Sequence, residues 1–592
     1  MTTKTNVISI EKAKNAKRKE KANFSLYAEY QNQLLSLPYG LQAPPHCIIG
    51  KNFTLIMKDR TTHRIDAGIY IKSIITDLQS NQLYWNLVFV RNGKIESYIM
   101  DRAQAQSATR IQALSGVGFP VHSGNARLIV EFLAQFEAHN YDRLLKKQQF
   151  TSQKMGWHKD GGFLLGKHYY TRGTEQVTFH PGDAVLQDLE RAYITQGTVN
   201  GWMSILQPAM QQSLHAQMAF YSAFVPPLLK ILQCDNFMVD FAQRTSRGKT
   251  TILRIAASCV GVPQEDKENS AMITWEATRS FIERYMDTIN ELPLIIDDTK
   301  RAKSPRDIDH LIYTATQGKG NGTSSFTGIR STKNWRTVLI SSGEQPATSY
   351  TNDGGARARV LTITGSPFPD GSATLVNTII SGLREHYGHG YAVFIPWLVN
   401  HRDAFQTQWH NEYQEWLAYF SNQSDDNVSH RLAQNMAAIY TAATLVHRAF
   451  EEVGIPLPWT RGHLEKLWDG IKQEAADELG DSKALEDTLA WVVSNPGKFP
   501  NKNEIGQPST TEVFGAWYQT NHTEYLVIRE QKLNEILKKW GYNPYEVLVS
   551  WRDQGYLDIP NSRKGFSTNV RFGNHVIGGY VKFKYSVLPI EK

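Results

Sequence analysis

The chain has 592 residues, which is too long for a single hydrophobic core and predicts roughly three or four domains. Its 41% of hydrophobic residues and its formal net charge of +7 at pH 7 are ordinary for a soluble globular protein. The three cysteines, Cys47, Cys234 and Cys259, are far apart and lack metal-ligand spacing. This excludes a disulfide framework and a zinc site, and favours the reducing cytoplasm.

The amino-terminal segment, residues 1–25, is polar and basic, and no apolar stretch follows it. We therefore expect no signal peptide. We interpret the segment as a disordered tail, with a nonspecific DNA-binding arm as the alternative. Its cations are Lys12, Lys14, Lys17, Arg18, Lys19 and Lys21.

Residues 26–200 are predicted to form an α+β domain. Strand-like segments precede a stretch, Leu128–Leu145, that has apolar residues at helical spacing. No catalytic constellation is recognisable here, and His158 beside Trp157 is interpreted as structural rather than as a metal ligand. The predicted strands are 53–57, 68–71, 84–90 and 97–100.

Residues 201–400 alternate between strands and helices, as a parallel α/β sheet requires. The most apolar region, Met218–Leu232, contains Pro226 and Pro227, so it is interpreted as a buried helix rather than a membrane span. The predicted strands are 236–242, 294–297, 336–341 and 360–363.

A glycine-lysine-threonine motif follows the first of these strands. Residues 246–251 read Ser-Arg-Gly-Lys-Thr-Thr, the second half of a loop that holds phosphates through backbone N–H groups at a helix start. Gly248 permits close backbone approach, Lys249 reaches the β- and γ-phosphates, and Thr250 offers a hydroxyl to Mg²⁺. The predicted nucleotide-binding residues are Thr245, Ser246, Arg247, Gly248, Lys249, Thr250 and Thr251.

A second motif, Leu294–Asp298, brings two adjacent carboxylates to the end of a buried strand. Asp297 is expected to hold the metal through water, and Asp298 to orient or deprotonate the attacking water. Together the two motifs predict a nucleoside triphosphatase that uses ATP and Mg²⁺. One departure is Gln243, which stands where the full loop pattern has its first glycine; it puts the loop geometry in question rather than phosphate binding.

Three further regions complete the chain. A basic, glycine-rich insert at 318–333 is short enough to be a hairpin, and residues 401–500 are predicted to be helical, notably at 408–420 and 431–452. After a linker at 495–508, residues 505–592 are predicted to form a winged helix that binds DNA or, alternatively, docks proteins. Its helices are expected at 511–519, 530–540 and 545–554, and its strands at 569–572 and 580–588. Its cations are Lys538, Lys539, Arg552, Arg563, Lys564 and Arg571.

The order of motifs resembles one known family. The sequences GWH, GW, SRGKTT, WEAT, LIIDD, QGKGNG, WRTVLISSGE and GGARAR follow one another along the chain. They resemble the MCM-like AAA+ helicases of the Cch type carried on staphylococcal cassette chromosome elements, and related phage and plasmid ATPases. The resemblance covers roughly residues 45–590. It implies a multidomain α/β protein with an N-terminal α+β domain, an AAA+ P-loop ATPase core with a parallel sheet, a helical lid-like region and a C-terminal winged helix.

The resemblance also implies a self-loading replicative DNA helicase that acts as a hexameric ring, with ATP bound between neighbours. Arg359 of the next subunit would stabilise charge on the transferring phosphoryl group, with Arg357 as the second choice. Arg431 would act as a second sensor, and Ser342 would hydrogen-bond the attacking water. The insert would be a pore hairpin that grips the DNA backbone. Its cations are Lys319, Arg330 and Lys333.

Two alternatives stay open: an AAA+ ATPase that loads or remodels protein partners, and a DNA-binding initiator in which nucleotide is a switch and no unwinding occurs. The pair Asp297 and Asp298 argues against a pure switch. The cations of the insert argue against a remodeller, although Phe326 fits one. The expected partners are DNA, further copies of the chain and an element-encoded primase, polymerase or initiator, with no membrane.

Overall fold

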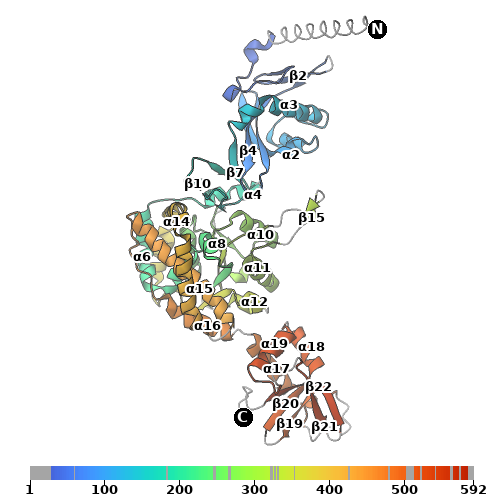
Figure 1. The fold of residues 1–592 in the computed structure, drawn as a ribbon, viewed down its shortest axis with the longest axis vertical. Helices are drawn as coiled ribbons and strands as arrows, with labels where there is room; N and C mark the ends of the chain where they lie inside the picture. Colours follow the sequence, from blue (N-terminus) through green and yellow to red (C-terminus); the bar gives the residue numbers. More distant parts are fainter. Residues whose placement is uncertain are drawn as a thin grey trace. The chain divides into compact units, whose positions relative to one another are not determined.

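The computed structural model divides into two compact units, Met1–Gln187 and Asp188–Lys592, which Figure 1 draws in sequence colours. The division falls before residue 200, where we expected the first domain to end. Among the described residues, no helix combines the length and apolar character needed to cross a membrane. The structure describes residues 29–584 apart from the segments 59–60, 182–183, 244–247, 265–268, 321–323, 326–327, 330–332, 352–353, 425–426, 478–479, 502–511, 521–522, 541, 560–564 and 573–574.

The first unit is built on a five-stranded sheet in the order β11-β7-β4-β5-β6. Its long central strands, β4 (Gly68–Asp77) and β5 (Leu83–Arg91), pair antiparallel and are rich in β-branched and aromatic residues that suit a half-buried pleated surface. All four strands predicted for this domain are confirmed. The remaining strands are β1 (Cys47–Ile49), β2 (Thr54–Lys58), β3 (Thr61–Ile65), β6 (Lys94–Asp101), β7 (Gln149–Ser152), β8 (Gly156–Trp157), β9 (Phe163–Leu165), β10 (His168–Tyr170) and β11 (Val177–Phe179).

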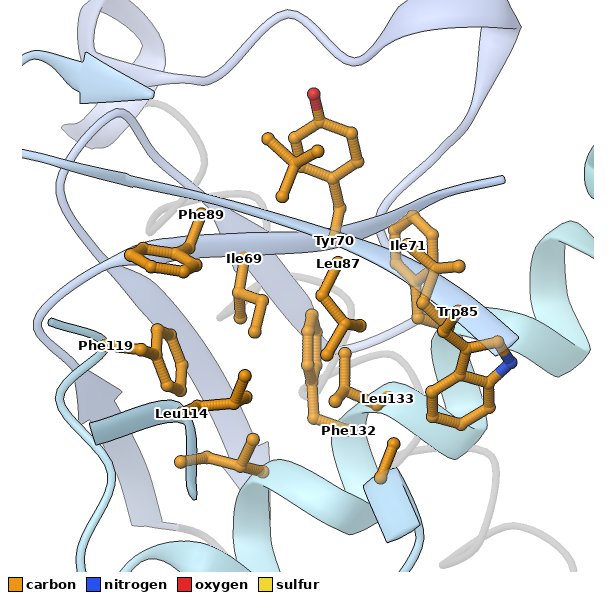
Figure 2. Packing of buried hydrophobic residues seen from close by; sticks show 14 of the residues in the cluster. Ile69, Tyr70, Ile71, Trp85, Leu87, Phe89, Leu114, Phe119, Phe132 and Leu133 are labelled. Atoms are coloured by element: carbon orange, nitrogen blue, oxygen red, sulfur yellow. The ribbon is translucent and has the colours of Figure 1, made fainter. Parts of the chain in front are cut away.

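The core of this unit lies between the sheet and helix α3 (Ala126–Leu145), which confirms the predicted helix. Figure 2 shows apolar side chains of β4 and β5 packed near Phe132 and Leu133 of α3. Trp85 is fully buried, and its indole N–H donates to Glu137 Oε1 at 2.9 Å. Arg102 donates to the same carboxylate at 2.8 Å, so the buried charge of Glu137 is compensated.

The second unit contains a five-stranded parallel sheet in the order β13-β14-β17-β12-β18. Continuous apolar runs form these strands because a parallel sheet is covered on both faces. The four predicted strands are confirmed as β12 (Phe237–Ala242), β14 (Leu294–Asp297), β17 (Val338–Gly343) and β18 (Val360–Thr364). The fifth strand, β13 (Met272–Thr274), was not predicted.

Helices surround this sheet. Helix α9 (Lys249–Ser258) packs beside α7 (Leu214–Ser222) against the central strands, and α11 (Pro305–Gln317) packs against β12 and β17. The predicted helices at 408–420 and 431–452 are confirmed as parts of α14 (His389–Ser421) and α15 (Asn427–Glu452), which pack against each other. The other helices of this unit before the C-terminal region are α5 (Leu189–Ala192), α6 (Val199–Gln212), α8 (Leu229–Leu232), α10 (Arg279–Thr288), α12 (Gly354–Arg357), α13 (Ala373–Gly382) and α16 (Trp468–Asp477). The first unit also contains α2 (Arg102–Ala105) and α4 (Ala184–Gln187).

The C-terminal region combines three helices with a four-stranded antiparallel sheet in the order β19-β20-β22-β21. The helix predicted at 511–519 is wrong, because strand β19 (Gly515–Thr520) occupies this stretch and pairs with β20 (Thr523–Arg529). Any side chain at Gly515 would meet the Val527 carbonyl oxygen, 2.1 Å from the Cβ position, so the pairing requires glycine. The other elements are α17 (Gly480–Val493), α18 (Glu530–Lys539), α19 (Pro544–Asp553), β21 (Thr568–Phe572) and β22 (His575–Lys584).

Candidate functional site

The two sequence motifs meet at the edge of the parallel sheet where the strands have their carboxyl ends. Strand β12 leads through residues 243–248 into α9, and β14 ends at Asp297 two strands away, with β17 between them. Open parallel sheets place their ligand sites at this edge, where loops leave the strands. Thr245, Ser246 and Arg247 lie outside the described residues.

The backbone at Gln243 has no strained conformation. Its backbone lies outside the left-handed region that would require glycine. Its N–H donates to the Gly343 carbonyl oxygen at 3.0 Å, and its own carbonyl oxygen accepts from Lys249 Nζ at 2.5 Å. Both contacts use the main chain, so the side chain at this position is not needed for them. The missing first glycine is therefore compatible with the backbone conformation at residue 243.

Gly248, among the described residues that precede α9, requires glycine. It caps α9 with φ 88° and ψ 7°, a left-handed conformation that side chains disfavour. A Cβ here would also lie 2.7 Å from Cδ2 of Phe368, which follows β18 and is buried. The aromatic ring thus covers the start of α9. Sequence reasoning missed Phe368, since only the fold brings it to Gly248.

Asp297 accepts hydrogen bonds from two hydroxyls at this edge. Thr250 Oγ1 donates to Asp297 Oδ2 at 3.0 Å, and Ser342 Oγ donates to Asp297 Oδ1 at 2.6 Å. Asp297 and Ser342 are both buried, whereas Thr250 and Lys249 are partly exposed. Hydroxyl and carboxylate oxygens converge here, which is the donor set that Mg²⁺ prefers. Thr251, the next residue of α9, is buried.

Asp298 follows directly in an unusual backbone conformation. Its φ of 61° and ψ of 87° lie in the left-handed region, where Asp is among the few side chains tolerated. Its N–H donates to Ser342 Oγ at 3.2 Å, and its carboxylate accepts from the Lys300 N–H at 3.2 Å. The side chain is thereby turned out of the strand and remains partly exposed.

Ser342 therefore contacts both acidic residues at the end of β14. Its hydroxyl contacts both Asp297 and Asp298, and its side chain is 1% exposed. Through these contacts Ser342 orients the carboxylate of Asp297. Its expected contact with an attacking water stays a prediction.

The arginines expected to act on the phosphoryl group lie elsewhere in the chain. Arg359 immediately precedes β18, and its carbonyl oxygen accepts from the Met238 N–H at 2.9 Å near the start of β12. From Met238 to Ala242, β12 extends by about 13 Å. Arg359 therefore lies near the amino ends of the parallel strands, whereas Asp297 lies at their carboxyl ends. Arg357 ends α12 and donates to the Thr351 carbonyl oxygen at 2.8 Å. Arg431 is exposed on α15.

The basic insert forms a hairpin, as predicted. β15 (Ser324–Ser325) pairs antiparallel with β16 (Gly328–Ile329), and at the base the Gly320 N–H donates to the Lys333 carbonyl oxygen at 3.0 Å. Lys319 is exposed, whereas Lys333 Nζ lies 3.9 Å from a carboxylate oxygen of Glu283. Arg330 lies outside the described residues.

Among the cations predicted for the C-terminal region, Arg552 lies in the last turn of α19 with its guanidinium carbon 5.6 Å from the centroid of the Phe566 ring, and Arg571 belongs to β21. Lys538 and Lys539 are exposed in the last turn of α18. Arg563 and Lys564 lie outside the described residues.

Comparison with known proteins supports the resemblance drawn from the sequence. A model described as a domain of unknown function, DUF927, matches residues 50–335, and a model described as the Cch helix turn helix domain matches residues 480–578. No curated protein matches. Among solved structures, the chain is similar to one described as "SCCmec type IV Cch - active helicase", with 16% sequence identity, a TM-score of 0.66 and coverage of 92% of this chain and 98% of that chain.

The Cch model matches the sequence of the C-terminal region, and the solved structure matches the fold over 92% of the chain. The expected likeness to Cch-type proteins is thereby confirmed. The protein is a multidomain α/β chain that shares its fold with a Cch helicase and carries a helix-turn-helix domain of the Cch type at its C-terminal end.

Proposed function

We propose that this chain is an ATP-driven, MCM-like DNA helicase of the cytoplasm that acts as a hexameric ring in the replication of a mobile genetic element. The observation that carries the proposal is the convergence of Thr250 and Asp297 beside the start of α9, with a 3.0 Å hydrogen bond between them. The similarity of the whole fold to a protein described as an active helicase supports the choice among ATPases.

The phosphates of ATP would bind at the start of α9. Backbone N–H groups at the start of α9 and the positive end of the helix dipole favour anions there, and Lys249 adds an ammonium group. Thr250 and Asp297 would hold Mg²⁺ through their oxygen atoms. When bound, the ion neutralises charge that develops on the phosphates during transfer.

Hydrolysis would use residues of two subunits. Asp298 would orient the attacking water, because its carboxylate is turned out of the strand and remains partly exposed. Arg359 lies at the opposite edge of its own sheet, so it would serve the nucleotide of a neighbouring subunit, with Arg357 as the second choice. Arg431 would contact the nucleotide as a second sensor.

DNA would be contacted at two places. Lys319 and Lys333 at the base of the hairpin, together with Arg330, would hold phosphates without reading bases. The helix-turn-helix domain, as a winged helix, would bind DNA through its cations. These cations are Lys538, Lys539, Arg563 and Lys564.

Strand displacement on a forked duplex with ATP tests the proposal, with Lys249→Ala and Asp298→Asn as controls. Unwinding by the wild-type protein alone is the expected result. ATP hydrolysis without unwinding would refute the helicase and favour a protein loader or remodeller. Nucleotide binding without hydrolysis would favour the nucleotide-switched initiator. Asn is the appropriate replacement for Asp298 because it also tolerates the left-handed backbone.

A further inference from the structure

The returning arm of the hairpin is held by one side of α10. Two of the residues that hold it, Glu283 and Asp287, lie four positions apart and so face the same way on α10. The third, Asn290, lies just past the end of the helix. Lys333 Nζ lies 3.9 Å from Glu283 Oε2, the Asn334 N–H donates to Asp287 Oδ1 at 3.0 Å, and the Arg336 N–H donates to Asn290 Oδ1 at 2.9 Å.

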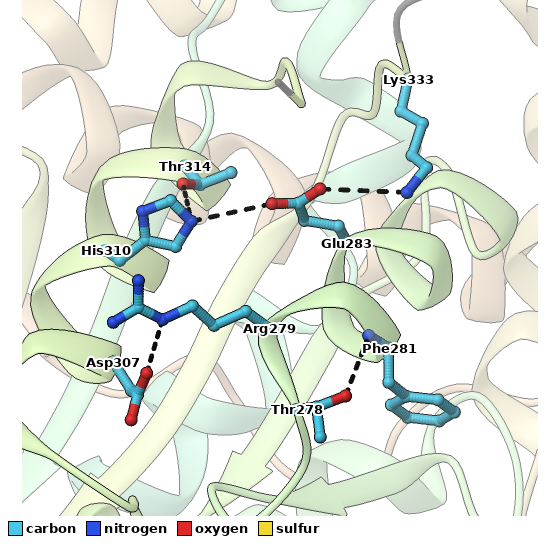
Figure 3. A network of polar contacts seen from close by, with 8 residues as sticks. All are labelled: Thr278, Arg279, Phe281, Glu283, Asp307, His310, Thr314 and Lys333. Carbon is cyan, nitrogen blue, oxygen red and sulfur yellow. Dashed lines mark hydrogen bonds and ion pairs between the residues drawn. The ribbon is translucent and has the colours of Figure 1, made fainter. Parts of the chain in front are cut away.

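Helix α10 is in turn fixed to α11, the helix that leads into the other arm of the hairpin. Glu283 Oε1 lies 3.7 Å from His310 Nε2, and Arg279 Nε donates to Asp307 Oδ1 at 2.5 Å. Figure 3 shows Glu283 between His310 and Lys333, which point at it from opposite sides. The side chain of Glu283 is 17% exposed, so its charge is only weakly screened by solvent.

The start of α10 is tied to the candidate nucleotide site. Thr274 pairs with Asp297 between β13 and β14, and the next residue, Trp275, donates its N–H to the Asp297 carbonyl oxygen at 3.2 Å. The indole N–H of Trp275 also donates to Ser341 Oγ of β17 at 3.0 Å. Three residues further on, Thr278 caps α10 by accepting the Phe281 N–H at 3.3 Å. A continuous set of bonded contacts therefore runs from Asp297 to the hairpin arm.

We propose that this face of α10 positions the DNA-contacting arm of the hairpin and transmits the nucleotide state of the site to it. Glu283 is the central positioning residue, because it fixes the ammonium group of Lys333. The proposal rests on the proposed function, since it takes the hairpin as the DNA contact. A shift of β13 and β14 on nucleotide binding moves the start of α10, and its acidic face carries Lys333 with it.

The test measures the affinity for single-stranded DNA with and without a nonhydrolysable ATP analogue. The affinity of the wild-type protein should differ between the two nucleotide states. Glu283→Gln should reduce the ratio of the two affinities about fivefold, which is the upper range for a partly exposed ion pair. Asp309→Asn is the matched control, because it removes the same charge from α11 outside this set of contacts. In a Lys333→Gln background, which breaks the same pair from its more exposed side, Glu283→Gln should have no further effect.

Three results would overturn the proposal: an unchanged nucleotide dependence in Glu283→Gln, an equal effect of Asp309→Asn, or additive effects of the Glu283 and Lys333 substitutions. Thermal melting of each variant separates loss of folding from loss of coupling. The affinity measurement does not require unwinding, so a wild-type protein that fails to displace a strand refutes the helicase, whereas the affinities still decide the role of Glu283.

Discussion

Replacing Ser342 by alanine tests the centre of the candidate site. The hydroxyl donates to Asp297 Oδ1 at 2.6 Å, accepts from the Asp298 N–H at 3.2 Å and is 1% exposed. Alanine fits the same space but removes both hydrogen bonds. The Asp297 carboxylate then keeps the bond from the Thr250 hydroxyl but loses the Ser342 hydroxyl that fixes the orientation of its other oxygen.

The expected magnitude follows from the type of each bond. A hydrogen bond to a charged group contributes about 1.5–3 kcal/mol and a neutral one about 1 kcal/mol, so the free energy of unfolding should fall by roughly 2–4 kcal/mol. Partners that orient a metal ligand typically change metal affinity by about 10- to 100-fold. We therefore expect the Mg²⁺ concentration for half-maximal ATP hydrolysis to rise at least about tenfold.

The assay is an Mg²⁺ titration of steady-state ATP hydrolysis, with thermal melting in parallel. Ser341→Ala is a matched control: Ser341 is adjacent, is fully buried, and accepts the Trp275 indole N–H at 3.0 Å. This neutral bond lies on the opposite face of β17, so its loss should cost about 1 kcal/mol without changing the Mg²⁺ requirement. Equal Mg²⁺ requirements in wild type and Ser342→Ala would refute the positioning of Asp297 as a metal ligand.

Four further predictions address other parts of the chain. Lys249→Ala should abolish ATP hydrolysis, measured by phosphate release; full turnover would contradict the phosphate-loop assignment. Arg359→Ala should retain nucleotide binding but lose turnover by roughly 10³-fold or more, and mixing it with Lys249→Ala protein should restore some activity if sites are shared. Lys333→Ala should weaken DNA binding irrespective of sequence and lower the salt dependence by about one phosphate contact; a sequence-specific loss would mean that the hairpin reads bases. Burial lowers the pKa of His447 from 6.5 to about 4, so the unfolded chain binds the proton more readily, and the Tm should fall as the pH drops from 6.5 toward 4. His447→Gln, which can still accept the Tyr221 hydroxyl, should show a flatter dependence, and an unchanged one would contradict this assignment.

The parts of the site that could be predicted are those encoded locally. A strand followed by Gly248, Lys249 and Thr250 can be recognised as a phosphate-loop motif from a few consecutive residues. The same holds for the buried strand that ends at Asp297. Long apolar runs also marked four of the five parallel strands. Strand β13 has only three residues, which is too short for a periodic pattern.

Contacts between distant segments could not be predicted in this way. Phe368 covers Gly248, and Glu283 holds Lys333, only because the sheet order brings these segments together. In the sequence, Glu283 is an ordinary helix carboxylate that would be assigned to a solvated face. The error at 511–519 has a related cause: Ala516 and Trp517 suit either a helix or a strand, and pairing with β20 decides the outcome.

The position of Arg359 at the amino edge of a sheet whose acidic residues lie at the carboxyl edge has a consequence for kinetics. If Arg359 acts on the nucleotide of a neighbouring chain, as proposed, an isolated chain would bind ATP but lack one of the groups that hydrolyse it. Hydrolysis per chain should then depend on total protein concentration, rising steeply through the range in which chains associate and reaching a plateau above it. Dilution alone would then stop ATP hydrolysis without unfolding the protein. In a cell, the number of copies made would itself determine whether ATP is consumed.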